Sequence, residues 1–179
     1  MIEVERKYRI ANKTPVLASL NNLNYSKNDK VHQSDRVYLK NSESFEKFMP
    51  TDPVMRIRTV GQSHKLTYKR SINKAGDAIE HEMSIDPVEA GEGMLRELGF
   101  QQVTVVKKMR TEYTKGDVTI ALDDVETLGS FVEVEVVCEE GEEEFAELKV
   151  ASAAAELSLM ESNIETKKYD RLMSEAIVH

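Results

Sequence analysis

The feature that most constrains the fold of this chain is an alternation of period two that sorts charge by segment. In the first ten residues, MIEVERKYRI, the side chains of Glu3, Glu5 and Lys7 share one side of an extended strand, because successive side chains of a strand point to opposite faces. The other side carries Ile2, Val4, Tyr8 and Ile10, with Arg6 among them. The segment therefore predicts a strand with one apolar face and one charged face.

The same pattern returns in five further segments, and within each of them the two charges have the same sign. The pairs are Arg56/Arg58, Lys65/Lys69, Glu80/Glu82, Lys108/Arg110 and Glu133/Glu135, and Asp123 adds a carboxylate on another strand. A sheet face that only meets water would scatter the signs, whereas neighbouring like charges on a sheet are destabilising. The cationic pairs therefore indicate a phosphate ligand, and the anionic pairs indicate a metal ion or the cationic strands as partners.

The apolar faces of these segments need a cover, which helices between the strands can supply. Together the segments predict an α+β fold: a closed or nearly closed antiparallel β-barrel with a charged lumen and with helices packed outside. A barrel of about eight strands leaves room for its own side chains and one small ligand. No low-complexity linker interrupts the sequence, so residues 1–179 are expected to form a single domain.

Turn and capping residues divide the rest of the chain. Strands are expected over residues 1–10, 31–40, 54–60, 65–69, 79–85, 103–113, 118–125 and 131–137. A helix is expected to start with Thr14 as its N-cap, and a second with Asp86 as its N-cap, ending at Gly99. Two more are expected over 139–159 and 167–177, whereas 41–53 is expected to be a long loop or flap and 73–77 a turn.

Composition excludes several classes of protein. The net charge of −8 over 179 residues argues against a generic nucleic-acid binder, which is usually basic. No run of eighteen apolar residues suggests a membrane span, and the N-terminus lacks the apolar core of a signal peptide. The single cysteine, Cys138, forbids an internal disulfide and is expected in the core. A cytoplasmic protein with no nucleic-acid or membrane partner is therefore expected.

The charged segments predict a small triphosphate as the ligand. Arginine offers a two-pronged donor to phosphate and lysine a point charge. The candidate phosphate-binding cations are Lys7, Arg56, Arg58, Lys65, Lys69, Lys108 and Arg110. The carboxylates would hold one or two Mg²⁺ or Mn²⁺ ions that bridge the phosphate oxygens, because hard divalent cations prefer oxygen ligands.

These segments resemble, in order and nearly end to end, the motifs of the CYTH superfamily, also called triphosphate tunnel metalloenzymes. Residues 2–8 resemble its ExExK signature, VMRIR its arginine strand, KLTYK its lysine strand and IEHE its first Glu-x-Glu strand. VVKKMR resembles its second cationic strand, and LDDVETLGSFVEVE resembles its most specific block. The pair Lys168-Tyr169 is similar to an element that closes the tunnel in that family.

The resemblance implies roles for individual residues. The metal site would consist of Glu3, Glu5, Glu133 and Glu135, with Asp123, Glu80 and Glu82 in support. The triphosphate would be bound by Arg56, Arg58, Lys65, Lys69, Lys108 and Arg110. Lys7, which would position phosphate or serve as a base, and Glu5 are the catalytic candidates.

Two positions depart from the pattern of the family. Ala78 stands where many members carry an arginine, two residues before the first glutamate of the IEHE segment. Arg36 stands where many carry an aspartate, two residues before the tyrosine matched by Tyr38, and Asp35 comes one residue earlier. Both departures bear on how a substrate is oriented more than on metal binding.

The resemblance leaves two activities open. A class IV-type adenylate cyclase would convert ATP to 3′,5′-cyclic AMP and pyrophosphate, and it is the favoured activity. A triphosphatase would hydrolyse thiamine triphosphate, inorganic triphosphate or a nucleoside triphosphate at the same site. A non-catalytic sensor of nucleotides or polyphosphate is the third alternative. The resemblance is also compatible with a homodimer.

Overall fold

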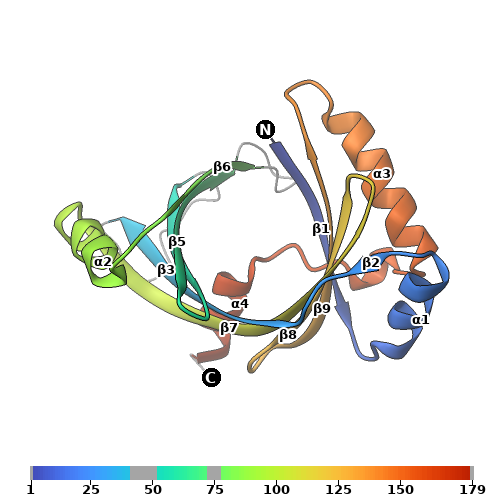
Figure 1. The fold of residues 1–179 in the computed structure, drawn as a ribbon, viewed down its shortest axis with the longest axis horizontal. Coiled ribbons are helices and arrows are strands. Elements are labelled where there is room, and N and C mark those ends of the chain that lie inside the picture. Colours follow the sequence, from blue (N-terminus) through green and yellow to red (C-terminus); the bar gives the residue numbers. More distant parts are fainter. Residues whose placement is uncertain (1, 41–51, 72–77, 178–179) are drawn as a thin grey trace. The chain divides into compact units, whose positions relative to one another are not determined.

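The computed structural model describes residues 2–40, 52–71 and 78–177 (Figure 1). The turn expected over 73–77, and all of the loop expected over 41–53 except Asp52 and Pro53, lie outside these ranges. The strands are β1 (Ile2–Ile10), β2 (Ser26–Lys27), β3 (Val31–Lys40), β4 (Val54–Val60), β5 (Ser63–Ser71), β6 (Ala78–Ser84), β7 (Phe100–Lys115), β8 (Val118–Val125) and β9 (Gly129–Cys138). The helices are α1 (Thr14–Asn22), α2 (Val88–Glu97), α3 (Glu143–Glu156), α4 (Tyr169–Ile177) and the short 3₁₀ helix η1 (Glu161–Asn163).

The strands form one antiparallel sheet that closes on itself. Their hydrogen-bonded order is β2-β7-β3-β4-β5-β6-β1-β9-β8, and β7 also pairs with β8. Eight strands therefore make a closed barrel, and the two-residue β2 is an additional strand at the edge of β7. The prediction of a closed α+β barrel with outer helices is confirmed.

Most elements match the sequence-based expectations to within two residues. The larger differences are the start of β7 at Phe100, three residues before the expected position, the unexpected elements β2 and η1, and the third helix, which spans Glu143–Glu156 and not 139–159. The N-cap of α1 is Lys13 and not Thr14, and the N-cap of α2 is Pro87 and not Asp86. The third helix begins only at Glu143, because Gly141 adopts a left-handed φ of 94° that no helix continues through. Gly99 ends α2 with a φ of 84°, as expected.

The chain divides into two compact units that interleave in the sequence. Unit 1 comprises Met1–Val31, Met109–Val125 and Gly129–Thr166. Unit 2 comprises His32–Lys108, Glu126–Leu128 and Lys167–His179. Each unit carries part of the predicted site.

Unit 1 is built around α3, which packs on β1, β8 and β9 (Figure 1). The small side chains of Ala146, Ala153 and Ala154 are buried there and let the helix approach the sheet closely. Across from them lie the fully buried residues Val4, Ile120, Val132 and Val134. Arg6 forms an ion pair with Glu147 of α3, which places its side chain with the helix. Cys138 is buried in the same core, as expected.

Unit 2 has a smaller core under α2. Leu95 of that helix packs against Tyr38 of β3 and Ile57 of β4, with Leu66 and Ile85 around them. These side chains all come from one face of their strands. The opposite face of the same strands carries the charged residues, as the period-two pattern predicted, together with the apolar side chains of Val37, Leu39 and Val54.

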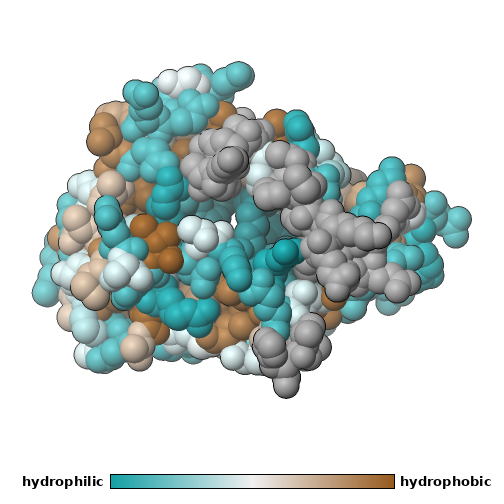
Figure 2. All heavy atoms as spheres, turned by 180° about the vertical axis from the view of Figure 1, so that it is seen from behind, coloured by the Kyte–Doolittle hydropathy of each residue, from teal (hydrophilic) through white to brown (hydrophobic). Residues whose placement is uncertain are grey.

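One face of the molecule carries many hydrophilic side chains, with hydrophobic side chains in small separate patches (Figure 2). Among the helices of the described chain, none is long and apolar enough to cross a membrane.

Candidate active site

Two carboxylates oppose each other directly on β1 and β9 of unit 1. In the antiparallel register Glu5 is the partner of Glu135, and Lys7 is the partner of Glu133. Glu3 lies two residues before Glu5 and therefore on the same face of β1. Like charges in directly opposed positions destabilise a sheet. The Glu5–Glu135 pair therefore requires a proton or a cation to neutralise it.

The ionisation of Glu135 reflects this crowding. Burial raises the pKa of Glu135, and the negative charges of Glu3 and Glu5 raise it further, to about 7. Without a cation, this carboxyl group therefore retains a proton over much of the neutral pH range. A divalent cation bound by these oxygens would favour the ionised form and release the proton. By their chemistry, Glu3, Glu5 and Glu135 therefore fit a hard cation such as Mg²⁺ or Mn²⁺.

The carboxylates do not, however, converge as a closed metal site would. Among residues 2–40, 52–71 and 78–177, no group of three or more His, Cys, Asp or Glu side chains is arranged to hold a metal ion. The fit of the acidic cluster to a metal therefore rests on its donor chemistry and on the shifted pKa of Glu135.

Arg110 of β7 binds two of the predicted carboxylates in unit 1. Its Nε donates to Oδ1 of Asp123 at 2.7 Å, and its Nη2 donates to Oδ2 at 2.5 Å and also to Glu133. Asp123 is completely buried, and Arg110 and Glu133 are 8% and 9% exposed. Both oxygens of Asp123 are thus engaged by one guanidinium group. The metal-ligand role expected for Asp123 and Glu133 stays a prediction, whereas their contact with Arg110 is part of the structure.

In unit 2 the strand register gathers the predicted cations on one face. Directly opposed residues of antiparallel strands share a face. Three rows of such residues cross β3, β4, β5 and β6: Asp35–Arg58–Lys65–Ser84, Val37–Arg56–Thr67–Glu82 and Leu39–Val54–Lys69–Glu80. Arg56, Arg58, Lys65 and Lys69 therefore lie together, on the face that α2 does not cover.

A two-pronged ion pair holds Arg58 in this face. Its Nε and Nη2 donate to Oδ1 and Oδ2 of Asp35 at 2.8 and 2.7 Å. Burial alone would raise the pKa of Asp35, but the hydrogen bonds and charge of Arg58 outweigh it, and the pKa is lowered. Arg56 and Lys108 lower it further. The guanidinium of Arg58 is therefore fixed in one plane beside other cations.

Glu80 and Glu82 of β6 are paired with these cations. Glu80 binds both Arg56, at 3.1 Å, and Lys69, at 3.2 Å, and Glu82 binds Lys65 at 2.6 Å. Burial would raise the pKa of Glu82, but the hydrogen bond and charge of Lys65 lower it overall. The two glutamates therefore hold the cationic side chains in place, and the supporting metal role expected for them stays a prediction.

Two of the predicted lysines are buried. Lys108 of β7 is 3% exposed, and its Nζ lies 4.9 Å from the ring centre of Tyr169 at the start of α4, both in unit 2. Lys7 in unit 1 is 5% exposed, and its backbone carbonyl accepts a hydrogen bond from Glu165. Lysine side chains are almost never buried to this degree unless they are paired, because an uncompensated ammonium group is costly to bury.

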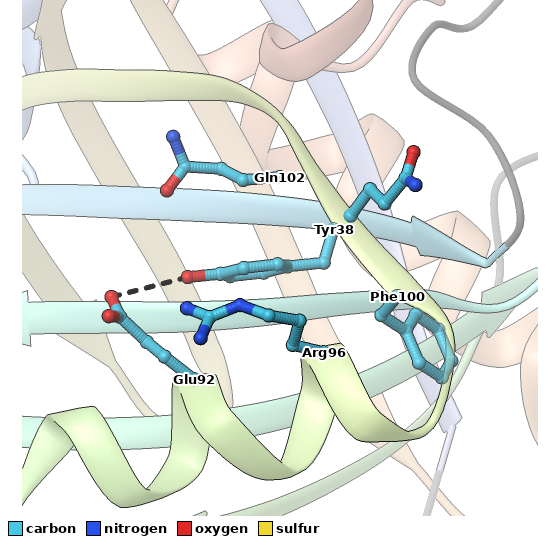
Figure 3. Close-up of a pocket in the computed structure, with 6 residues that line it drawn as sticks. Tyr38, Glu92, Arg96, Phe100 and Gln102 are labelled. Carbon is cyan, nitrogen blue, oxygen red and sulfur yellow. Dashed lines mark hydrogen bonds between the residues drawn. The ribbon is translucent and has the colours of Figure 1, made fainter.

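Unit 2 also has a cavity on the opposite face of β3. It has a volume of about 360 Å³ and is lined by Tyr38, Glu92, Arg96, Phe100, Gln101 and Gln102. Figure 3 shows the hydroxyl of Tyr38 directed at Glu92, a contact of 3.4 Å. Burial raises the pKa of Tyr38 to about 12, with Glu92 contributing. Because Tyr38 and Asp35 point to opposite faces of β3, this cavity is separate from the cationic face.

Two features of the site were missed in the sequence. Asp35 was noted only as the residue before Arg36, which departs from a family pattern, yet it is the partner of Arg58. Thr67, which is completely buried, lies between Arg56 and Glu82 in the strand register. Its place in KLTYK, in phase with Lys65 and Lys69, was the only signal available.

Comparison with known proteins agrees with this architecture. The family model described as the CYTH domain matches residues 1–169. A protein of Methanocaldococcus jannaschii, named "Putative adenylate cyclase", is 34% identical over 139 residues, which are 75% of this chain and 77% of that protein. A solved structure from Pyrococcus horikoshii is 32% identical, covers 97% of this chain and 98% of its own, and superposes with a TM-score of 0.81.

A more distant structure shares the fold alone. It is a protein of Hippeastrum described as having a dominant triphosphatase activity, 16% identical over 88% of each chain, with a TM-score of 0.60.

Fold and site together define a closed antiparallel barrel that presents acidic and basic strands on the faces its helices leave uncovered. The chain belongs to the CYTH family. This is a family of triphosphate-binding enzymes that use divalent metal ions. The resemblance found in the sequence is thus confirmed.

Proposed function

We propose that this protein is a divalent-metal-dependent adenylate cyclase, which converts ATP to 3′,5′-cyclic AMP and pyrophosphate. The observation that carries its metal dependence is the direct opposition of Glu5 and Glu135, with Glu3 beside them. The name of the archaeal relative, at 34% identity, supports a cyclase over a triphosphatase.

The acidic residues of unit 1 provide the proposed metal site. Glu3, Glu5 and Glu135 would hold the ion, and Glu133 and Asp123 would contribute while holding Arg110. A bound Mg²⁺ or Mn²⁺ would supply positive charge next to the phosphate oxygens. One or two ions are compatible with this number of carboxylates.

The basic residues provide the proposed triphosphate site. Arg58 and Arg110 are held rigidly by Asp35 and Asp123, so little freedom is lost when they bind phosphate. Further phosphate oxygens would be bound by Arg56, Lys65, Lys69 and Lys108. Glu80 would keep Arg56 and Lys69 in place, and Glu82 would do the same for Lys65. Both glutamates would also support the metal site.

In the proposed reaction the ribose 3′-oxygen forms a bond to the α-phosphorus, and the bond from that phosphorus to the bridging oxygen breaks. Pyrophosphate leaves with the bonding electrons. Glu5 and Lys7 are the proposed catalytic residues: one of them takes the proton of the 3′-hydroxyl or positions the attacked phosphate. A triphosphatase would use the same residues, with water attacking the terminal phosphorus.

Product analysis tests this proposal. The protein is incubated with ATP and Mg²⁺ or Mn²⁺, and cyclic AMP, ADP, AMP, phosphate and pyrophosphate are resolved. Cyclic AMP with an equal amount of pyrophosphate supports the cyclase. ADP with phosphate shows a triphosphatase instead, and binding without turnover shows a sensor. Glu135→Gln is expected to abolish turnover, whereas the matched control Glu97→Gln, an exposed change on α2, leaves it intact.

A further inference from the structure

Gln33 of β3 has a buried side-chain amide whose oxygen is unsatisfied within the described residues. Its side chain is only 7% exposed, and its Oε1 has no hydrogen-bond partner in the described part of the chain. Most buried polar side-chain atoms in proteins have a partner, because an unsatisfied buried acceptor is destabilising. An exception in an otherwise well-paired strand therefore needs an explanation.

The place of Gln33 in β3 links it to the cationic face. It lies two residues before Asp35, so both side chains point to the same face of the strand. Asp35 is the partner of Arg58. Arg36 and Tyr38, which point the other way, contact Glu92 of α2. The unsatisfied oxygen is therefore on the phosphate-binding side and not on the side of the cavity in Figure 3.

Gln33 is not the sole residue of unit 2 with such an atom. Thr104 Oγ1 of β7, the strand next to β3, also lacks a partner among the described residues, and so does Nε of Arg56. Burial alternates along β7 so that Thr104 is in phase with the buried Lys108. Arg56 is opposite Val37, which lies four residues beyond Gln33 along β3. At the usual rise of a strand, Val37 is therefore ~13 Å from Gln33 along the strand.

A ligand would have to offer these atoms different kinds of hydrogen-bonding group. The N–H of Arg56 suits a phosphate oxygen, which accepts hydrogen bonds. A carbonyl oxygen such as Gln33 Oε1 cannot bind an ionised phosphate oxygen, because both only accept. It requires an N–H or O–H donor, which inorganic triphosphate lacks when fully ionised. A nucleoside carries such donors on its base and its ribose.

We propose that Gln33 is a specificity-determining residue, whose side-chain carbonyl accepts a hydrogen bond from the amino group of the base or from the 2′-hydroxyl of the ribose of the substrate. The inference rests on the proposed function and adds to it a residue that would distinguish a nucleoside triphosphate such as ATP from inorganic triphosphate. A site built to hydrogen-bond a donor discriminates strongly against a ligand without one. The rival explanation is an ordered water that satisfies Gln33 permanently.

Kinetics of Gln33→Leu distinguish these explanations. The variant removes the carbonyl at nearly constant size, and Gln102→Leu, an exposed glutamine on the opposite side of unit 2, is the matched control. The loss of one neutral hydrogen bond should lower kcat/KM for ATP about 3- to 10-fold. The inhibition constant of inorganic triphosphate, or its kcat/KM if it is hydrolysed, should change less than twofold. Because the unsatisfied acceptor is gone, the Tm should not fall.

The outcomes separate the inference from the function that it rests on. An equal loss for ATP and inorganic triphosphate, or no loss for either, overturns the role of Gln33 and leaves the metal-dependent activity standing. A wild-type protein that neither binds nor turns over any triphosphate overturns both.

Substrate analogues give a second test that does not depend on the folding of a variant. Inosine triphosphate lacks the exocyclic amine of ATP, and 2′-deoxy-ATP lacks one hydroxyl. With the wild-type protein, at least one of them should show a 3- to 10-fold lower kcat/KM than ATP. With Gln33→Glu, which retains an acceptor, that discrimination should persist, and with Gln33→Leu it should vanish. Equal kcat/KM values for all three nucleotides on the wild type contradict the inference.

Discussion

The carboxylate of Asp35 binds the guanidinium of Arg58 through two hydrogen bonds, between Nε and Oδ1 at 2.8 Å and between Nη2 and Oδ2 at 2.7 Å. The same arrangement recurs in the other unit, where Asp123 binds Nε and Nη2 of Arg110. Both aspartates are buried. Each unit therefore fixes one arginine by the same two-pronged contact.

Replacement of Asp35 by Asn should destabilise the protein in a pH-dependent way. The folded-state pKa of Asp35 is lowered, so its ionised form stabilises the fold above about pH 4, and that stabilisation is lost as the pH falls through the folded pKa. Removing one partner of a buried ion pair typically costs about 3–5 kcal/mol. Denaturant titrations at pH 7 and pH 3 should show a large difference between wild type and variant that shrinks at the lower pH.

The exposed Asp29 provides the control for this experiment, and Asp29→Asn should change the free energy of unfolding by less than about 0.5 kcal/mol at either pH. A difference between wild type and Asp35→Asn that stays constant from pH 7 to pH 3 would show that the charge of Asp35 is not the source of its contribution.

Asp123 should act on the triphosphate through Arg110 more than on the metal. Asp123→Asn is expected to weaken the binding of inorganic triphosphate about tenfold or more, because Arg110 loses its buried counter-charge. The Kd for Mn²⁺ alone should change less in this variant than in Glu135→Gln. Calorimetry of both ligands with both variants decides the question, and an equally severe loss of Mn²⁺ binding would establish Asp123 as a metal ligand.

The metal-free protein should lose stability as the pH rises through neutrality. The folded-state pKa of Glu135 is raised to about 7, above its ordinary value of 4.5, so the folded state binds more protons than the unfolded state between these values. Stability therefore falls with increasing pH in this window, by roughly 1–3 kcal/mol in total. With a chelator present, Tm values from pH 5 to 8 should show this fall in the wild type and a weaker one in Glu135→Gln. Saturating Mn²⁺ should abolish the difference in slope.

Neighbouring cations of β5 should differ in function because they point to opposite faces. Lys69 binds Glu80 on the charged face, whereas Arg70 is exposed on the other. Lys69→Ala should raise the KM for ATP about tenfold, as expected for the loss of a charge-assisted hydrogen bond, and Arg70→Ala should change it less than twofold. Similar effects of both substitutions on KM would contradict the assignment of faces.

The sequence determined the elements of this fold and the side of each strand that carries charge. Residues 54–60 and 118–125 are strands with the predicted bounds, because alternation is a local property that any paired strand must satisfy. Helix starts were less well predicted, since Thr14 and Asp86 had the chemistry of N-caps but lie one residue away from the actual caps.

Only the tertiary structure decided which charges meet. Nothing in the sequence shows that Asp35 opposes Arg58, that Arg110 engages Asp123, or that Glu5 stands across from Glu135. The period of a strand is set by its own backbone, whereas strand order and register depend on how distant segments close the barrel. The sequence therefore supplied the charges, and the pairing of strands determined which like charges stand opposite each other, as Glu5 and Glu135 do, and which are held by an opposite charge, as Arg58 and Arg110 are.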